Sequence, residues 1–120
     1  MNKRLIGNAG EEYAARLYKK LGYEILARNY TVRGGELDIV AQKDGEIVFI
    51  EVRLRAIGGL VSAGESVTAV KRRRVLLAAQ TYLMQHPSSL QPRFDVVALE
   101  AQNGAIIGCE RIENAFGGDL

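Results

Sequence analysis

The chain has 120 residues, of which 48% are hydrophobic and 25% charged, as in an ordinary globular protein, and this length allows one domain over residues 1–120 but no second core. The formal net charge of +2 excludes capture of an anionic partner by the field of the whole molecule, so such a partner would need a local basic patch. The single cysteine, Cys109, excludes a disulfide framework within the chain and a metal site built from thiolates. The sequence has no apolar run long enough to span a membrane, so we expect a cytoplasmic protein with no membrane partner.

The first predicted element is a helix over residues 9–21. Asn8 suits an N-cap, and Glu11 follows three residues later, as in a capping box. The apolar positions that recur at helical spacing are Ala14, Leu17, Tyr18 and Leu21. Glu11 falls on the same inward face, so it either caps the helix or is a carboxylate that leans toward the acidic pair described below.

Three strands are predicted after this helix. The first covers residues 23–30, and a hairpin of two more occupies residues 36–54. Asp44-Gly45 lies between two β-branched runs and is among the strongest short-range hairpin signals. Residues 47–52 are nearly all apolar, which is typical of a strand buried on both faces.

A type I′ turn at Asp44-Gly45 determines which side chains meet across the hairpin. Partners then have numbers that sum to 89, so Asp38 lies opposite Glu51, with Glu36 opposite Arg53 on the same face. Like charges directly opposite each other destabilise a hairpin, and a buried carboxylate must be paired or coordinated. We therefore predict a compensating cation at Asp38 and Glu51. The alternative is an ion pair between Glu36 and Arg53, with both other carboxylates in water.

The second half begins with residues 56–66, which carry three glycines and no period, so we expect a mobile loop. A second helix is predicted over residues 67–85, with Ser66 or Thr68 as its N-cap. Its early turns contain four consecutive basic residues, Lys71, Arg72, Arg73 and Arg74. They oppose the helix dipole, which makes sense if they face an anion such as phosphate, although a solvated charged face also explains them.

Two more strands complete the chain, over residues 93–100 and 105–109, and residues 114–120 are expected to be a frayed tail. The resulting order, α-β-β-β-α-β-β, predicts an α/β fold. A central mixed sheet of about five strands would be flanked by helices.

The acidic pair determines the chemistry that we expect. An Asp and a Glu that face the same way on neighbouring strands form a hard oxygen site suited to Mg²⁺ or Mn²⁺. Such an ion lowers the pKa of a bound water and neutralises charge on a scissile phosphate. Arg53, two residues beyond Glu51, would project into the same site and hold the water or the phosphate. These parts suit phosphodiester hydrolysis.

Several motifs lie in order along the chain: Gly10-Glu11, Gly22-Tyr23, Gly35-Glu36-Leu37-Asp38-Ile39-Val40, Val48-Phe49-Ile50-Glu51-Val52-Arg53, Lys71 and Arg93-Phe94-Asp95-Val96-Val97. In this order and spacing they resemble the YraN family of uncharacterised bacterial proteins. That family has a restriction-endonuclease-like fold and is related to archaeal Holliday-junction resolvases. The resemblance runs from about residue 7 to residue 100, and it is more specific to the family than to an activity.

The resemblance implies roles for particular residues. The wider nuclease superfamily carries an Asp, then a Glu or Asp, then any residue and a Lys. By resemblance Asp38 and Glu51 are metal ligands, and Glu11 matches a helix carboxylate near the metal. Arg53 stands where the lysine belongs and cannot lose its proton, so it could orient water but not act as a general base. The predicted nucleic-acid-binding residues are Arg55, Lys71, Arg72, Arg73 and Arg74.

Two functions follow. The first is a metal-dependent endonuclease that acts on DNA phosphodiesters, including branched or repair intermediates, with catalytic Asp38, Glu51 and Arg53 and with Mg²⁺ or Mn²⁺ as cofactor. The second is a nucleic-acid-binding domain with a degenerate nuclease site that is catalytically weak or inactive. The intact carboxylates favour the first function, and Arg53 favours the second. The resolvase relationship implies a homodimer by analogy.

Overall fold

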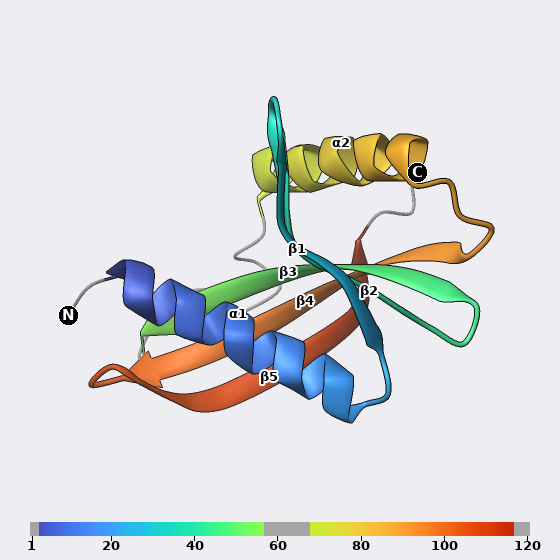
Figure 1. The fold of residues 1–120 in the computed structure, drawn as a ribbon. Coiled ribbons are helices and arrows are strands. Elements are labelled where there is room, and N and C mark those ends of the chain that lie inside the picture. Colours follow the sequence, from blue (N-terminus) through green and yellow to red (C-terminus); the bar gives the residue numbers. More distant parts are fainter. Residues whose placement is uncertain (1–2, 57–67, 117–120) are drawn as a thin grey trace.

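The computed structural model describes residues 3–56 and 68–116, which form two helices and one five-stranded sheet (Figure 1). The elements in chain order are α1 (Lys3–Lys20), β1 (Glu24–Val32), β2 (Gly35–Lys43), β3 (Glu46–Ala56), α2 (Ala69–Gln85), β4 (Gln91–Gln102) and β5 (Ala105–Phe116). This order is the predicted one, and the mixed sheet confirms the predicted α/β fold class. Neither described helix combines the length and the apolar character needed to cross a bilayer.

The strands lie side by side in the order in which they occur in the chain, β1-β2-β3-β4-β5. All neighbours are antiparallel except β3 and β4, which run parallel. Parallel neighbours need a crossover connection, and α2 lies in it. β3 is the central strand, which explains its nearly continuous apolar sequence.

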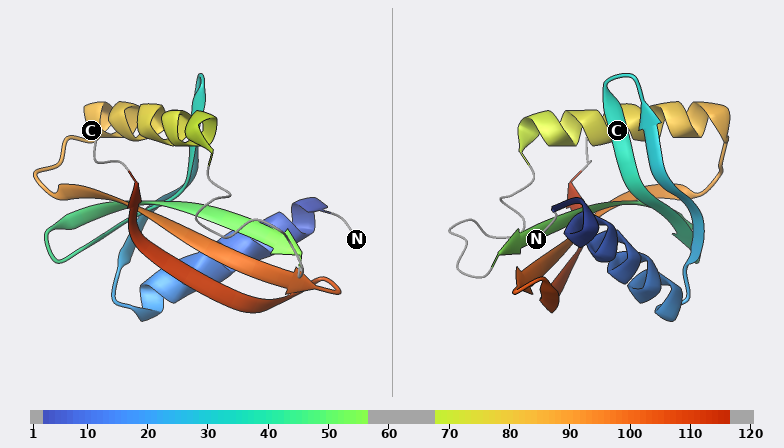
Figure 2. Two further views of the ribbon diagram at one scale, coloured as in Figure 1. Left: turned by 180° about the vertical axis from the view of Figure 1, so that it is seen from behind. Right: turned by 60° about the vertical axis from the view of Figure 1, so that its left-hand side comes forward.

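The two helices cover opposite faces of the sheet, as Figure 1 and the views in Figure 2 show. On one face, Tyr18 of α1 packs into a core with Ile50 of β3, and on the other Tyr82 of α2 packs with Phe49 of the same strand. Residues 49 and 50 thus point to different cores, as the alternation of a strand requires. The β1–β2 hairpin curls out of the sheet and rises beside α2.

The turn between β2 and β3 has the predicted geometry. Asp44 and Gly45 have φ values of 50° and 83°, and positive φ at both central residues is the mark of a type I′ turn. The paired residues sum to 89 as predicted, from Lys43 with Glu46 to Ile39 with Ile50. The ladder ends there, one residue before the acidic pair.

The first helix is longer than predicted. α1 begins at Lys3, so Asn8 is not an N-cap and the capping role of Glu11 is wrong. Asn and Gly inside a helix each cost no more than about 1 kcal/mol, which packing offsets. At Gly10 a side chain would press on Leu99, with its Cβ 3.2 Å from Leu99 Cδ1, so the glycine permits close approach of helix and sheet.

Other boundaries also differ. Ala56 ends β3, whereas the rest of the expected mobile loop and residues 117–120 of the expected tail lie outside the described residues. The predicted tail was wrong for residues 114–116, because β5 continues to Phe116. Its end is tied to β4, where the rings of Phe94 and Phe116 lie 5.3 Å apart. The sequence of β5 does not alternate regularly between apolar and polar residues, so its full length could not be predicted from the sequence.

A buried ionic network connects α1, β4 and β5. Asp95 is 0% exposed, and its Oδ2 accepts hydrogen bonds from the Tyr18 hydroxyl at 2.6 Å and from Arg93 Nη2 at 2.8 Å. Its Oδ1 accepts from Arg93 Nε at 2.9 Å and from the backbone N–H of Asn114 at 3.0 Å. A charge buried so completely is tolerated because it is paired and hydrogen-bonded, and here the bonds hold α1 in place on the sheet.

Removal of the Asp95 charge should destabilise the protein. Asp95→Asn leaves the buried guanidinium of Arg93 without its main counter-charge, so we expect a loss of about 3 kcal/mol or more in the free energy of unfolding, measured by urea denaturation. The control is Glu12→Gln, which removes exposed ion pairs to Arg16 and Arg28 and should leave the midpoint unchanged. Equal losses in the two variants would contradict a special role for the network.

Candidate functional site

β2 separates from β3 at Asp38, and this separation positions the Asp38 carboxylate. Beyond the last ladder pair, the backbone N–H of Val52 on β3 donates to Asp38 Oδ2 at 2.8 Å. On β2, Leu37 packs into the core under α2 whereas Ile39 packs into the core under α1. Residues two apart in a regular strand share a face, so β2 twists sharply at Asp38. The side chain therefore lies in the split between the two strands.

The Asp38 carboxyl meets the carboxyl of Glu51 in this split. The two groups are in hydrogen-bonding contact, and Glu51 is only 7% exposed. Burial raises the pKa of Glu51, and the neighbouring Asp38 raises it further, to about 8. Burial also raises the pKa of Asp38, although the N–H of Val52 opposes this shift. The alternative in which both carboxylates face water is thus excluded.

Two cations act on the acidic pair. Arg53 Nη1 lies 3.4 Å from Glu51 Oε1, on the same face of β3. The positive charge of Lys71, on α2, lowers the pKa of both Asp38 and Glu51. α2 reaches the pair because the hairpin is in backbone contact with it: a side chain at Gly35 would overlap the carbonyl oxygen of Arg74. The charge of Lys71 is therefore within electrostatic reach of the two carboxylates.

Glu11 approaches the pair from α1. Burial and the Asp38 charge raise the pKa of Glu11, and a hydrogen bond to the Asn29 side chain opposes the shift. Asn29 adopts a φ of 53°, a left-handed conformation in which Asn is enriched, and sequence reasoning gave it no role at the site. Glu11 thus lies within electrostatic reach of Asp38, and its role as a metal ligand stays a prediction.

The donor set fits a hard divalent cation with two protein ligands. Within residues 3–56 and 68–116, no three His, Cys, Asp or Glu side chains are arranged to hold a metal ion. The carboxyls in contact are those of Asp38 and Glu51. Mg²⁺ is commonly held by one or two carboxylates, with waters and substrate phosphates as the remaining ligands. The pair therefore meets the minimal requirement for such an ion.

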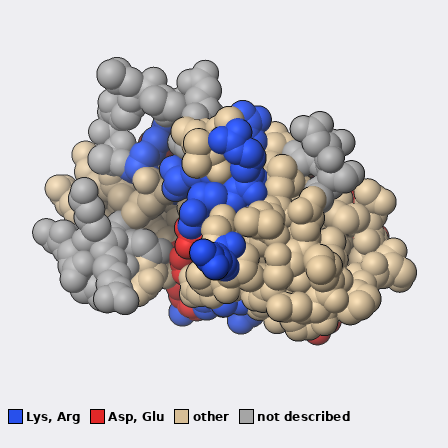
Figure 3. Space-filling view, turned by 90° about the horizontal axis from the view of Figure 1, so that it is seen from above, with Lys and Arg blue, Asp and Glu red and all other residues tan. Residues whose placement is uncertain are grey.

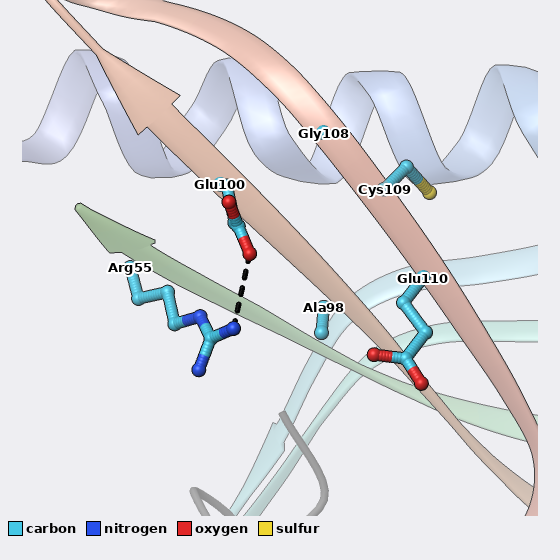
Figure 4. Close-up of a pocket in the computed structure, with 6 residues that line it drawn as sticks. All are labelled: Arg55, Ala98, Glu100, Gly108, Cys109 and Glu110. Atoms are coloured by element: carbon cyan, nitrogen blue, oxygen red, sulfur yellow. Dashed lines mark hydrogen bonds and ion pairs between the residues drawn. The ribbon is translucent and has the colours of Figure 1, made fainter. Parts of the chain in front are cut away.

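Arg55 continues the same strand face, but it is engaged with another carboxylate. Its Nη2 lies 3.0 Å from Glu100 Oε1 on β4 (Figure 4). A cavity of about 250 Å³ adjoins the ion pair and is lined by Arg55, Ala98, Glu100, Gly108, Cys109 and Glu110. A half-exposed pair contributes little to stability, so a phosphate could replace Glu100 as the partner of Arg55. Burial raises the pKa of the Cys109 thiol, which disfavours a nucleophilic role.

The remaining basic residues lie on the first turns of α2. Thr68 is the N-cap, and its hydroxyl accepts a hydrogen bond from the backbone N–H of Lys71 at 3.3 Å. Thr68 was one of the two predicted N-caps, so this prediction is confirmed. The side chains of Arg72, Arg73 and Arg74 are exposed. The structure thus separates Lys71, which acts on the carboxylates, from the three arginines, which face solvent.

Comparisons with known proteins place this arrangement in a family. Residues 10–99 match the model described as "Uncharacterised protein family UPF0102". A UPF0102 protein of Symbiobacterium thermophilum is 43% identical over 114 residues, covering 94% of this chain and 97% of the relative. One of Chloroflexus aurantiacus is 40% identical over 119 residues, covering 98% and 97%, and one of Caldicellulosiruptor saccharolyticus is 38% identical over 118 residues, covering 97% and 100%. The matched region includes all the acidic residues of the site.

The raised pKa of Glu51 predicts a pH dependence of stability. Because its folded pKa, about 8, exceeds the ordinary value of 4.5, the folded state binds more protons between these values and stability falls as pH rises through this window. The slope for one group is at most about 1.4 kcal/mol per pH unit. In chelator, Glu51→Gln should flatten this slope and exceed the wild type in melting temperature at pH 8. Parallel melting curves for the two proteins across this window would contradict the burial of an acidic pair.

Proposed function

The chain belongs to the uncharacterised protein family UPF0102, as its motifs indicated, and we propose that it is a metal-dependent nuclease that hydrolyses phosphodiester bonds in DNA. One observation carries this proposal: the carboxyl groups of Glu51, which is buried, and of Asp38, which is half-buried, come together from neighbouring strands, and the charges of Arg53 on β3 and Lys71 on α2 act on them. Such a pair is unfavourable for stability alone, and a divalent cation would remove the repulsion.

Asp38 and Glu51 would hold Mg²⁺ or Mn²⁺ in this function. When bound, the ion supplies a water of lowered pKa and neutralises charge on the phosphate. Both carboxylates ionise at lower cost beside a divalent cation, so their raised pKa values support a metal site. The N–H of Val52 holds the Asp38 carboxylate in one orientation.

Arg53 and Lys71 would stabilise the charge that develops on the phosphate. Arg53 remains protonated, so it holds a phosphate oxygen or a water and does not accept a proton. Lys71 adds a second positive charge from α2, an element that the β1–β2 hairpin contacts. Fixed cations aimed at developing charge are a major source of rate enhancement in phosphoryl transfer.

A second candidate is a nucleic-acid-binding domain without turnover. The contact of Arg53 with Glu51 favours it, because the guanidinium neutralises one carboxylate without a metal ion. Binding by this domain would weaken with salt and would not depend on the carboxylates. A homodimer, implied by the resolvase analogy, is proposed for either function.

Cleavage assays decide between the two candidates. Labelled linear and branched DNA are incubated with Mg²⁺, with Mn²⁺ and with chelator. We expect metal-dependent cleavage that Asp38→Asn and Glu51→Gln reduce to background, while the exposed neighbour variant Glu36→Gln keeps the wild-type rate. Salt-sensitive binding with no cleavage, unaffected by these substitutions, would establish the second candidate instead.

Restoration of the superfamily lysine tests the role of Arg53 directly. Arg53→Lys retains the positive charge and adds a group that can lose its proton near a metal, so we expect the cleavage rate to rise by roughly tenfold or more, within the range of positioned acid–base groups. Arg53→Ala should lower the rate below the wild type. A wild-type rate in both variants would show that residue 53 takes no part in catalysis.

A further inference from the structure

The arginines of the described residues fall into two classes. Those that lie within 4.0 Å of a carboxylate are Arg16, Arg28, Arg53, Arg55, Arg93 and Arg111. Among residues 8–56 and 68–116, those without such a contact are Arg33, Arg72, Arg73 and Arg74, and all four are exposed.

The unpaired arginines come from two elements that touch. Arg33 and Gly34 form the turn of the β1–β2 hairpin, which rises beside α2 (Figure 1). A Cβ at Gly34 would lie 3.3 Å from Leu77 Cδ2, and one at Gly35 would overlap the carbonyl oxygen of Arg74. The hairpin tip is therefore in contact with the turns of α2 that follow the basic cluster, which brings Arg33 to the same surface.

This surface leads to the acidic pair. Figure 3 shows Lys and Arg side chains gathered in a band on the face that carries α2 and the hairpin, with Asp and Glu side chains at its border. Lys71 connects the basic band with the acidic pair, because it belongs to the basic cluster of α2 and its charge acts on Asp38 and Glu51. α2 contains no acidic residue that would neutralise the band.

The band also lacks a stacking platform. Proteins that bind single-stranded nucleic acid combine positive charge with exposed aromatic rings on which bases stack. Among the exposed large apolar side chains of the described residues the aromatic one is Tyr13, which lies on α1. A surface with cations and no rings is suited to phosphates rather than to unpaired bases.

From these observations we propose that Arg33, Arg72, Arg73 and Arg74 form one binding surface for the phosphate backbone of double-stranded nucleic acid, with the tip of the β1–β2 hairpin as an integral part. This inference rests on the proposed function and names the form of its substrate. Arg33 is the residue that sequence reasoning missed, because only the packing of the hairpin on α2 brings it to the basic cluster. Recognition through phosphates is independent of base sequence.

Fluorescence polarisation in chelator separates binding from cleavage. The probes are two linear duplexes of unrelated sequence and one of their single strands, titrated at several KCl concentrations. We expect the wild type to bind both duplexes equally and more tightly than the single strand. Arg33→Ala should weaken duplex binding several-fold and reduce the slope of log K against log salt by about 0.9, the value for one lost phosphate contact. Arg33→Lys should restore most of this loss, since lysine also binds phosphate as a point charge.

The control is Arg16→Ala on α1, which removes an arginine that is also exposed but is paired with Glu12, and it should change neither affinity nor slope. A wild-type slope for Arg33→Ala, or tighter binding of the single strand than of the duplex, would overturn the inference and leave the proposed nuclease function standing. Absence of binding to any probe by the wild type would instead overturn the proposed function itself. Binding to vesicles of anionic phospholipid but to no duplex would replace nucleic acid with a membrane surface.

Discussion

Two carboxyl groups in contact inside a largely apolar sheet are the constraint on which the rest of the site depends. Asp38 and Glu51 repel each other once both are ionised, and burial makes that repulsion stronger. Three groups around them reduce this penalty: the N–H of Val52, the guanidinium of Arg53 and the charge of Lys71. A fold that needed only stability would replace such a pair with apolar side chains.

The architecture holds these groups together from several directions. The type I′ turn sets the register of β2 and β3, and the separation of the strands at Asp38 opens room for the two carboxyls. Contact of the hairpin with α2, which requires glycine at residue 35, brings Lys71 to the same place. On the other face the buried Asp95 network holds α1, and with it Glu11, against the sheet. The motif around Asp95 thus contributes to positioning rather than to chemistry.

Local signals in the sequence were sufficient for the order of helices and strands along the chain and for the register that brings Asp38 opposite Glu51. Asp44-Gly45 specifies a turn with positive φ at both residues, so the register followed from two residues alone. Features that tertiary packing determines could not be predicted from such local signals. Asn8 was predicted to cap the first helix, yet it lies inside α1, whose Gly10 packs closely on the sheet. The site role of Lys71 and the position of Arg33 arise from contacts between elements far apart in the chain.

The most direct test of the account is a titration of thermal stability with Mg²⁺ and Mn²⁺ at neutral pH, in the wild type and in Asp38→Asn and Glu51→Gln. If the two carboxylates share a divalent ion, the wild type gains about 2.7 kcal/mol at a cation concentration one hundred times the dissociation constant, and both variants lose this gain. If cations leave the wild type unchanged while Asp38→Asn raises its melting temperature, the pair is a site of repulsion with no ion, and the account is wrong.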